Sequence, residues 1–113
     1  MKIEEIWKLL LSYQTAVSVV HEISRSDGYP IYPEEISNFM KLLESPPWVA
    51  YEYQPKEISG ILASIENANT KEIKWALTAA ARSERFCDGS WEQILKNRSL
   101  DPVLERLQEL HHA

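Results

Sequence analysis

The side chains best suited to chemistry lie in and just before the segment Thr78 to Trp91, TAAARSERFCDGSW. Four of them share one face of a predicted helix, at successive spacings of four, four and three residues: Lys74, Thr78, Arg82 and Arg85. Two guanidinium groups on one face can bind a carboxylate or a phosphate through paired hydrogen bonds. The spacing therefore favours an anion-binding site formed by Thr78, Arg82 and Arg85.

A structural interpretation of the same residues competes with this hypothesis. Arg82 and Arg85 can instead pair with Glu84, Asp88 and other acids, and so tie the helix end to the following turn. A protein partner is a third way to use the two arginines. The remaining residues of the segment are predicted to form a structural motif: Glu84, Phe86, Asp88, Gly89 and Trp91.

The other polar candidates are interpreted as structural. His21 is far in sequence from other metal ligands, and we expect it to be a hydrogen-bonded histidine at the inner edge of the first helix. Cys87 follows a helix C-terminus, which opposes thiolate formation, so we expect a buried and unreactive thiol. The pairs Glu4-Glu5 and Glu34-Glu35 lie in first helical turns, where the helix dipole favours carboxylates.

Familiar catalytic and cofactor motifs are missing from the sequence. Its three glycines are far apart, at positions 28, 60 and 89, so they form no phosphate-binding loop of the usual kinds. There is no C-x-x-C and no H-E-x-x-H motif. We therefore assign no catalytic residue, no metal and no cofactor, and an enzyme is the least favoured class.

Composition bounds the class of protein further. The chain has 113 residues, of which 44% are hydrophobic and 26% charged, as is typical of a globular domain. Its formal net charge of −5 disfavours general nucleic-acid binding. The single cysteine, the lack of an 18-residue apolar run and the acidic start MKIEEIWK lead us to expect a cytoplasmic protein without a membrane-spanning segment.

The N-terminal half predicts two helices and a short ribbon. Apolar spacing predicts a helix from Ile3 to about Arg25, ended by Ser26 to Pro30. Pro33 is predicted to open a second helix, which ends before Pro46. The aromatic stretch 48–53 favours an extended segment, so the sequence allows a small two-stranded ribbon of 29–32 with 48–53.

The C-terminal half predicts the remaining helices from their start signals. Pro55 marks one start, and Asn69 with Glu72 forms a capping box for the next helix. Ser90 with Gln93 resembles a second capping box, and Asp101-Pro102 starts the last helix. The expected fold is all-α: a single compact domain over residues 1–113, with about six helices around one core.

The C-terminal part resembles a known family, the domain of unknown function DUF6508 of bacterial and archaeal proteins. The residues that carry the resemblance are Leu77, Thr78, Ala79, Arg82, the run Glu84 to Gly89, and Trp91, followed by Leu100, Pro102 to Leu104, Arg106 and Leu107. The similarity is good over residues 73–110 and looser over 29–53. Family members often have a glycine after the short helix, where this chain has Asn97-Arg98-Ser99, and Asn97 suits the left-handed conformation.

The resemblance implies a prokaryotic protein and a shared fold unit, but no reaction. Two functional hypotheses stay open. The first is a non-enzymatic protein-interaction or regulatory module, or self-association, in which exposed aromatic residues form the partner surface: Tyr29, Tyr32, Trp48, Tyr51 and Tyr53. The second is a domain that binds a small anionic ligand on the face of Arg82 and Arg85.

Overall fold

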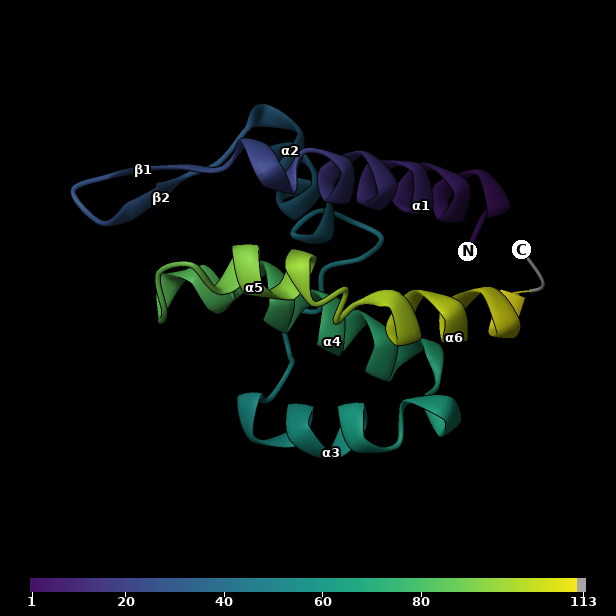
Figure 1. Cartoon of the computed structure of the whole chain (residues 1–113). Helices are drawn as coiled ribbons and strands as arrows, with labels where there is room; N and C mark the ends of the chain where they lie inside the picture. The colour runs from purple at the N-terminus through teal and green to yellow at the C-terminus, as the bar shows by residue number, and fades with distance from the viewer. Residues whose placement is uncertain (112–113) are drawn as a thin grey trace.

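Helices dominate the computed structural model, which describes residues 1–111 (Figure 1). Residues 112 and 113 of the predicted domain lie outside this range. Among the described residues, no helix is both long and apolar enough to cross a membrane. The regular elements are α1 (Ile3–Ser18), β1 (Ser24–Ser26), β2 (Tyr29–Ile31), α2 (Glu34–Leu43), α3 (Ile58–Ala63), α4 (Thr70–Arg82), α5 (Ser90–Lys96) and α6 (Asp101–His111), joined in part by single 3-10 turns.

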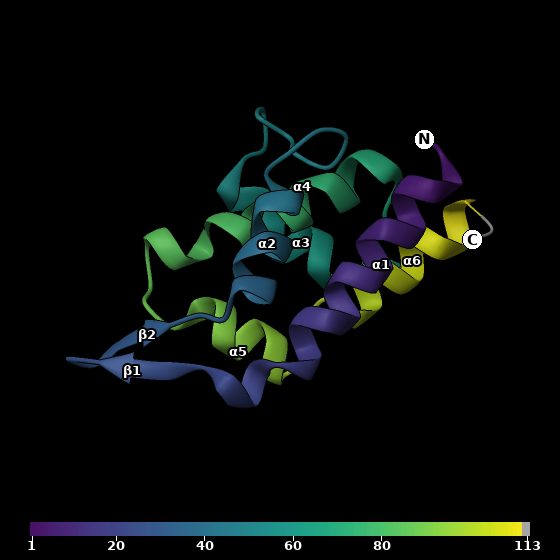
Figure 2. The ribbon, with the colours of Figure 1, turned by 90° about the horizontal axis from the view of Figure 1, so that it is seen from above.

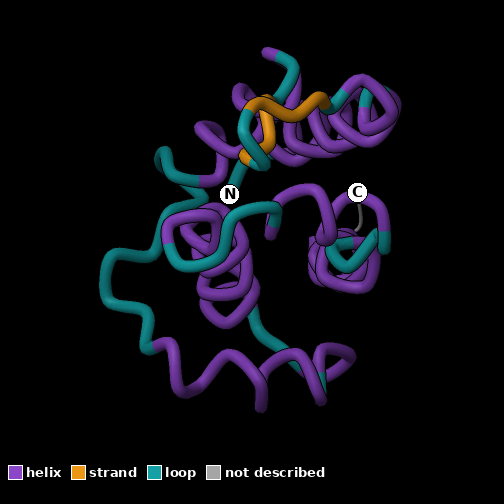
Figure 3. Tube along the Cα trace, turned by 60° about the vertical axis from the view of Figure 1, so that its left-hand side comes forward, coloured by secondary structure: helices purple, strands orange, loops and turns teal. Residues whose placement is uncertain are grey.

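The six α-helices of the described chain stack in layers, which confirms the expected all-α class. Helices α1 and α2 form one layer, α4 and α6 lie side by side in the next, and α3 packs on the far side of α4 (Figures 1 and 3). Viewed from above, α1 runs over α6 (Figure 2). The core between the layers is apolar, and its largest fully buried side chains include Ile6, Leu9, Ile36, Phe39, Leu43, Trp48, Ile73, Leu77, Leu95, Val103 and Leu107.

Apolar periodicity and capping explain the helices that meet at this core. In α1 the buried residues Ile6, Leu9, Tyr13 and Ala16 follow spacings of three, four and three. The predicted capping box of α4 is confirmed, since Asn69 Oδ1 accepts from the Glu72 amide at 2.8 Å and Glu72 Oε1 accepts from the Asn69 amide at 3.1 Å.

The two-stranded ribbon exists, but the predicted partner segment was wrong. β2 pairs antiparallel with β1, and Ser26 lies opposite Tyr29. Asp27 and Gly28 form the two-residue loop with φ of 51° and 84°, as a hairpin turn with two positive φ angles requires. Because this Asp-Gly turn needs strands on both sides, α1 ends at Ser18 rather than near Arg25.

The segment 48–53 does not form the predicted strand, because its contacts are with the core and with α4. Trp48 is buried in the core with 1% of its surface exposed. The Ala50 amide donates to Thr78 Oγ1 at 2.8 Å, so this amide bonds to α4 and not to a neighbouring strand. Of the three aromatic residues, Trp48 lies in the core and Tyr53 lies against Arg82 of α4, whereas Tyr51 is exposed.

An ionic cluster fastens the hairpin to α5. Glu92 is buried in α5 and forms ion pairs with Arg25 of β1 and with Lys96 one turn later, the latter at 3.0 Å. The hydrogen bonds from Arg25 and Lys96 lower the pKa of Glu92 below its ordinary value of 4.5. The charged carboxylate is therefore the form that the folded state prefers.

This preference predicts a specific acid sensitivity. The stabilisation from Glu92 is complete above the unfolded-state pKa and is lost as the pH falls through the lower folded-state pKa. We expect Glu92→Gln to be less stable than the wild type at neutral pH and to lose less stability on acidification below pH 4.5. Urea unfolding across this pH range measures the difference, with the exposed Glu66→Gln as control. Parallel pH profiles of wild type and Glu92→Gln would contradict the assignment.

Candidate functional site

A pocket of about 680 Å³ opens between α2 and the C-terminal end of α4, close to α5. Its size is within the usual range for small-molecule sites. We call it the Arg85 pocket. Its lining combines apolar and charged side chains: Met40, Lys41, Glu44, Ser45, Ala81, Glu84, Arg85 and Trp91.

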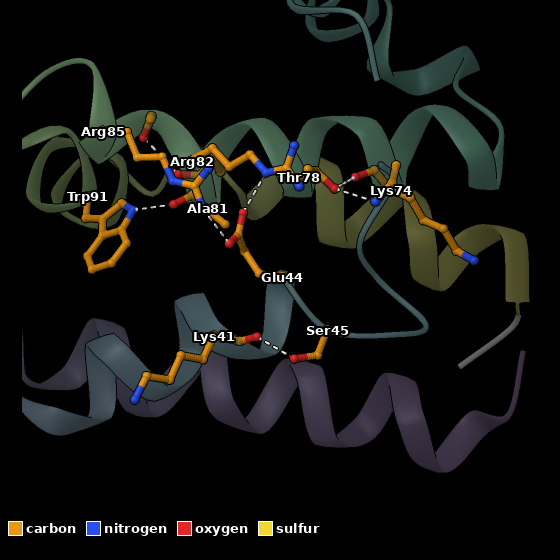
Figure 4. Close-up of polar contacts among 12 residues, drawn as sticks. Lys41, Glu44, Ser45, Lys74, Thr78, Ala81, Arg82, Arg85 and Trp91 are labelled. Atoms are coloured by element: carbon orange, nitrogen blue, oxygen red, sulfur yellow. Dashed lines mark hydrogen bonds and ion pairs between the residues drawn. The ribbon is translucent and has the colours of Figure 1, made fainter. Parts of the chain in front are cut away.

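One carboxylate holds both arginines of the sequence motif. Glu44 follows the last residue of α2, and its two oxygens accept separately from Arg82 Nε at 2.7 Å and Arg85 Nη2 at 3.0 Å (Figure 4). The arginines were predicted to pair with Glu84, Asp88 and other acids. Their partner is one of the other acids, Glu44 at the end of α2, and neither Glu84 nor Asp88 forms an ion pair with them among the described residues. Because one negative charge meets two positive charges, the cluster retains a positive charge.

Arg82 is the inner member of this pair. Its side chain is 21% exposed, and its guanidinium group lies 5.3 Å from the centre of the Tyr53 ring. The hydrogen bond to Glu44 raises the pKa of Arg82 above its usual value. Arg82 does not line the pocket, and it supports the fold by joining α4 to α2 and to the segment before α3.

Arg85 is the outer member and forms part of the pocket wall. It lies in the 3-10 turn Ser83–Arg85 that continues α4, and its side chain is 61% exposed. Within residues 1–111, its guanidinium group makes a single hydrogen bond, the one to Glu44. Lys41 adds a second exposed cation to the lining, and it has no ion-pair partner among the described residues. These two groups are available to an anion.

Thr78 lies away from the pocket. It is fully buried, and its hydroxyl accepts from the Ala50 amide and donates to the Lys74 carbonyl, both at 2.8 Å (Figure 4). The Thr78 hydroxyl thus acts as a donor and as an acceptor within the protein. The structure brings Arg82 and Arg85 together, but it gives Thr78 a role in fixing the chain before α3.

Glu84, the residue before Arg85, joins the pocket lining to two other segments. Its carboxylate accepts from the Tyr32 hydroxyl at 2.9 Å, the Gly89 amide at 2.7 Å and the Trp91 amide at 2.9 Å. These donors come from the chain after the hairpin and from the N-terminus of α5. Glu84 therefore takes the capping role that the sequence assigned to Ser90, whose hydroxyl donates instead to Ser83 Oγ at 2.8 Å.

Trp91 gives the pocket an aromatic wall with a fixed orientation. Its indole N–H donates to the Ala81 carbonyl at 3.0 Å (Figure 4), and its ring packs against that of Tyr32 with the ring centres 5.1 Å apart. Burial, followed by the hydrogen bond to Glu84, raises the pKa of Tyr32. The Tyr32 hydroxyl therefore stays protonated and remains a donor to Glu84.

Several other residues lie differently from the sequence prediction. Cys87 is exposed and not buried, because the turn after α4 directs residues 86–88 toward solvent. His21 is also exposed, in the 3-10 turn after α1, and is 3.8 Å from the Glu22 carboxylate. Asp88 is exposed as well. Within residues 1–111, no group of three or more His, Cys, Asp or Glu side chains is arranged to hold a metal.

A family model confirms the resemblance. The model described as "Family of unknown function (DUF6508)" matches residues 22–113. The chain belongs to this family. The match excludes α1, and it extends well beyond the 73–110 stretch that resembles DUF6508 most strongly by motif. Comparison with curated proteins gave no match, and comparison with solved structures gave none either.

The sequence did not indicate two charged residues of the Arg85 pocket, Lys41 and Glu44. Glu44 is 38 residues from Arg82, and Lys41 lies one turn before Glu44 on α2. The sequence shows Glu44 at the end of the second predicted helix, just before Ser45-Pro46-Pro47. A single glutamate at a helix end is too common to identify the residue that it binds. The two residues enter the site only through packing of α2 on α4.

The backbone conformation of Gly89, at the start of α5, can be tested by substitution. Its φ of +90° is unfavourable for any residue with a Cβ, whereas a methyl group at this position would meet no atom within 4 Å and so would not clash. We expect Gly89→Ala to destabilise the domain by about 1 kcal/mol through backbone strain alone. Gly60 in α3 has equally open surroundings but no positive φ, so Gly60→Ala should stabilise by up to about 1 kcal/mol. Equal effects in urea unfolding would contradict this.

Proposed function

We propose that this DUF6508 domain is a non-enzymatic binding module whose Arg85 pocket takes a carboxylate or similar anionic group attached to an apolar body. The observation that supports the proposal most directly is the sharing of one carboxylate by two guanidinium groups beside an open pocket. Arg85 is proposed as the direct contact, Lys41 as a second one, and Arg82 as the residue that positions Glu44.

The charges around the pocket support an anionic ligand. Three cations, Arg82, Arg85 and Lys41, accompany two carboxylates, Glu44 and Glu84. Glu44 is neutralised by the arginines, and Glu84 accepts from one hydroxyl and two amides. The pocket is thus locally positive on a chain whose net charge is −5, which favours an anion at this place.

The apolar part of the lining supports a ligand that is more than a free inorganic ion. Met40 and Ala81 are buried beneath the pocket, and the half-buried Trp91 forms its wall. A planar or branched apolar body against these side chains would remove apolar surface from water. An aromatic carboxylate is the simplest compound that combines both features.

A second candidate is a protein-interaction module that recognises an acidic side chain of a partner at the same pocket. It is favoured by Phe86, which follows Arg85 and is 83% exposed. The aromatic surface expected from the sequence does not support this use as a whole. Trp48 is buried, Tyr32 bonds to Glu84 and Tyr53 packs under Arg82, whereas Tyr29 and Tyr51 are exposed.

The proposal includes a cytoplasmic setting. Cys87 is the single cysteine of the chain and is exposed. An exposed thiol without a partner is better maintained in a reducing compartment.

Removal of the pocket cations tests the proposal. We expect benzoate to shift the amide and indole NMR signals of Trp91, and benzyl alcohol, which has the same ring without the charge, to bind more weakly. Arg85→Gln should weaken benzoate binding about tenfold or more, because a charge-assisted hydrogen bond contributes roughly 1.5–3 kcal/mol. Lys41→Gln should have a smaller effect, since Lys41 is an exposed point charge.

Lys56→Gln is the matched control, because it removes the same charge from an exposed site that does not line the pocket. It should leave benzoate affinity unchanged. Wild-type affinity in Arg85→Gln, or an equal loss in Lys56→Gln, would show that the pocket is not the anion site. An acidic peptide that binds where benzoate does not would favour the protein-interaction candidate.

A further inference from the structure

An exposed apolar stripe runs along the outer face of α1. It consists of Ile3, Trp7 and Leu11, whose side chains are 47%, 55% and 66% exposed. The opposite face of the same helix is buried in the core through Ile6, Leu9 and Tyr13. α1 is therefore apolar on two sides, and the fold uses only one of them.

The stripe forms one continuous ridge. Its residues are spaced by four, and such residues are neighbours on successive turns of a helix. Three large apolar side chains in one row, with a tryptophan at the centre, are typical of a contact surface rather than of scattered surface residues. α1 lies at the outer edge of the molecule (Figures 1 and 3), and the exposed fractions of the three side chains show that residues 1–111 leave the ridge open.

Charged residues beside the ridge indicate what kind of surface could cover it. Glu4 and Lys8 are exposed, lie on the same flank of the ridge, and form no ion pair with any residue from 1 to 111. A surface that carries both an acid and a base on one flank is complementary to a copy of itself turned by 180°.

We propose that α1 is a self-association surface on which two copies of this chain pair antiparallel, with Trp7 at the centre. In this arrangement Ile3 of one copy faces Leu11 of the other. On the same flank, Glu4 lies two residues, or about 3 Å along the helix axis, from Lys8 of the other copy. The two Lys8 residues are equally far apart, so two attractive contacts outnumber one repulsive contact.

The contact is small, so the dimer is a reversible one. Each copy contributes three large apolar side chains from a helix of 16 residues, whereas a standard stable interface buries about 800 Å² from each partner. The surface is also independent of the Arg85 pocket, because none of its residues lines that pocket. Failure of either proposal leaves the other untouched.

Sedimentation velocity of the full chain over a wide concentration range tests the proposal. We expect the wild type to shift from monomer to dimer as its concentration rises. Leu11→Gln should raise the dimer dissociation constant about tenfold or more, since it removes apolar contact from both halves of a symmetric interface. Leu62→Gln is the matched control: Leu62 is 46% exposed on α3, at the opposite side of the molecule, and its substitution should not change the dissociation constant.

Charge exchange tests the antiparallel register separately. Lys8→Glu should weaken the dimer, because it places acids opposite acids, and the double change Glu4→Lys with Lys8→Glu should restore it. Circular dichroism of each variant checks that the helices are retained. A wild type that stays monomeric at all concentrations, equal effects of Leu11→Gln and Leu62→Gln, or a failure of the double change to restore the dimer would overturn the proposal.

Discussion

The contact of Glu44 with two arginines joins the end of α2 to the end of α4 beside the apolar core that the two helices share. Each carboxylate oxygen accepts from a different guanidinium group, so the end of α2 is fixed against the end of α4 at two points. Removal of the glutamate would leave Arg82, which is mostly buried, without its counter-ion, and such unpaired charges are costly. The Arg85 pocket is the space that remains between the two helix ends, and its shape therefore depends on this contact.

Glu84 is the second acid of the pocket lining, and it binds groups other than the arginines. Its three donors come from two separate segments: Tyr32 lies before α2, and Gly89 and Trp91 lie at the start of α5. Both acids of the lining are consequently used within the protein, while the cations at the pocket are only partly neutralised. The site is positive because its acids are bonded within the protein while its cations are only partly neutralised. The composition of the chain does not explain this charge, since the chain as a whole is acidic.

Local patterns predicted the features that depend on local interactions. The capping box of Asn69 and Glu72 involves residues only three apart, so it was found in the sequence. The Asp27-Gly28 hairpin was missed although it is also local, because the turn was interpreted only as a helix stop. Asn97 was expected in the left-handed conformation, but Arg98 adopts it, with φ of 52°, and its guanidinium group bonds to Asp101 at 2.8 Å.

The candidate site was less predictable from the sequence, because the role of each of its residues depends on tertiary contacts. Arg82 and Arg85 are the same residue type three positions apart, and the sequence treats them as equivalent. The chain passes from the α-helix into a 3-10 turn after Arg82, which leaves Arg82 21% exposed over the Tyr53 ring and Arg85 61% exposed at the pocket. One guanidinium group thereby becomes part of the fold while the other faces solvent. A change in backbone geometry at a helix end, which no residue pattern in this chain announces, separates the structural arginine from the one that can bind a ligand.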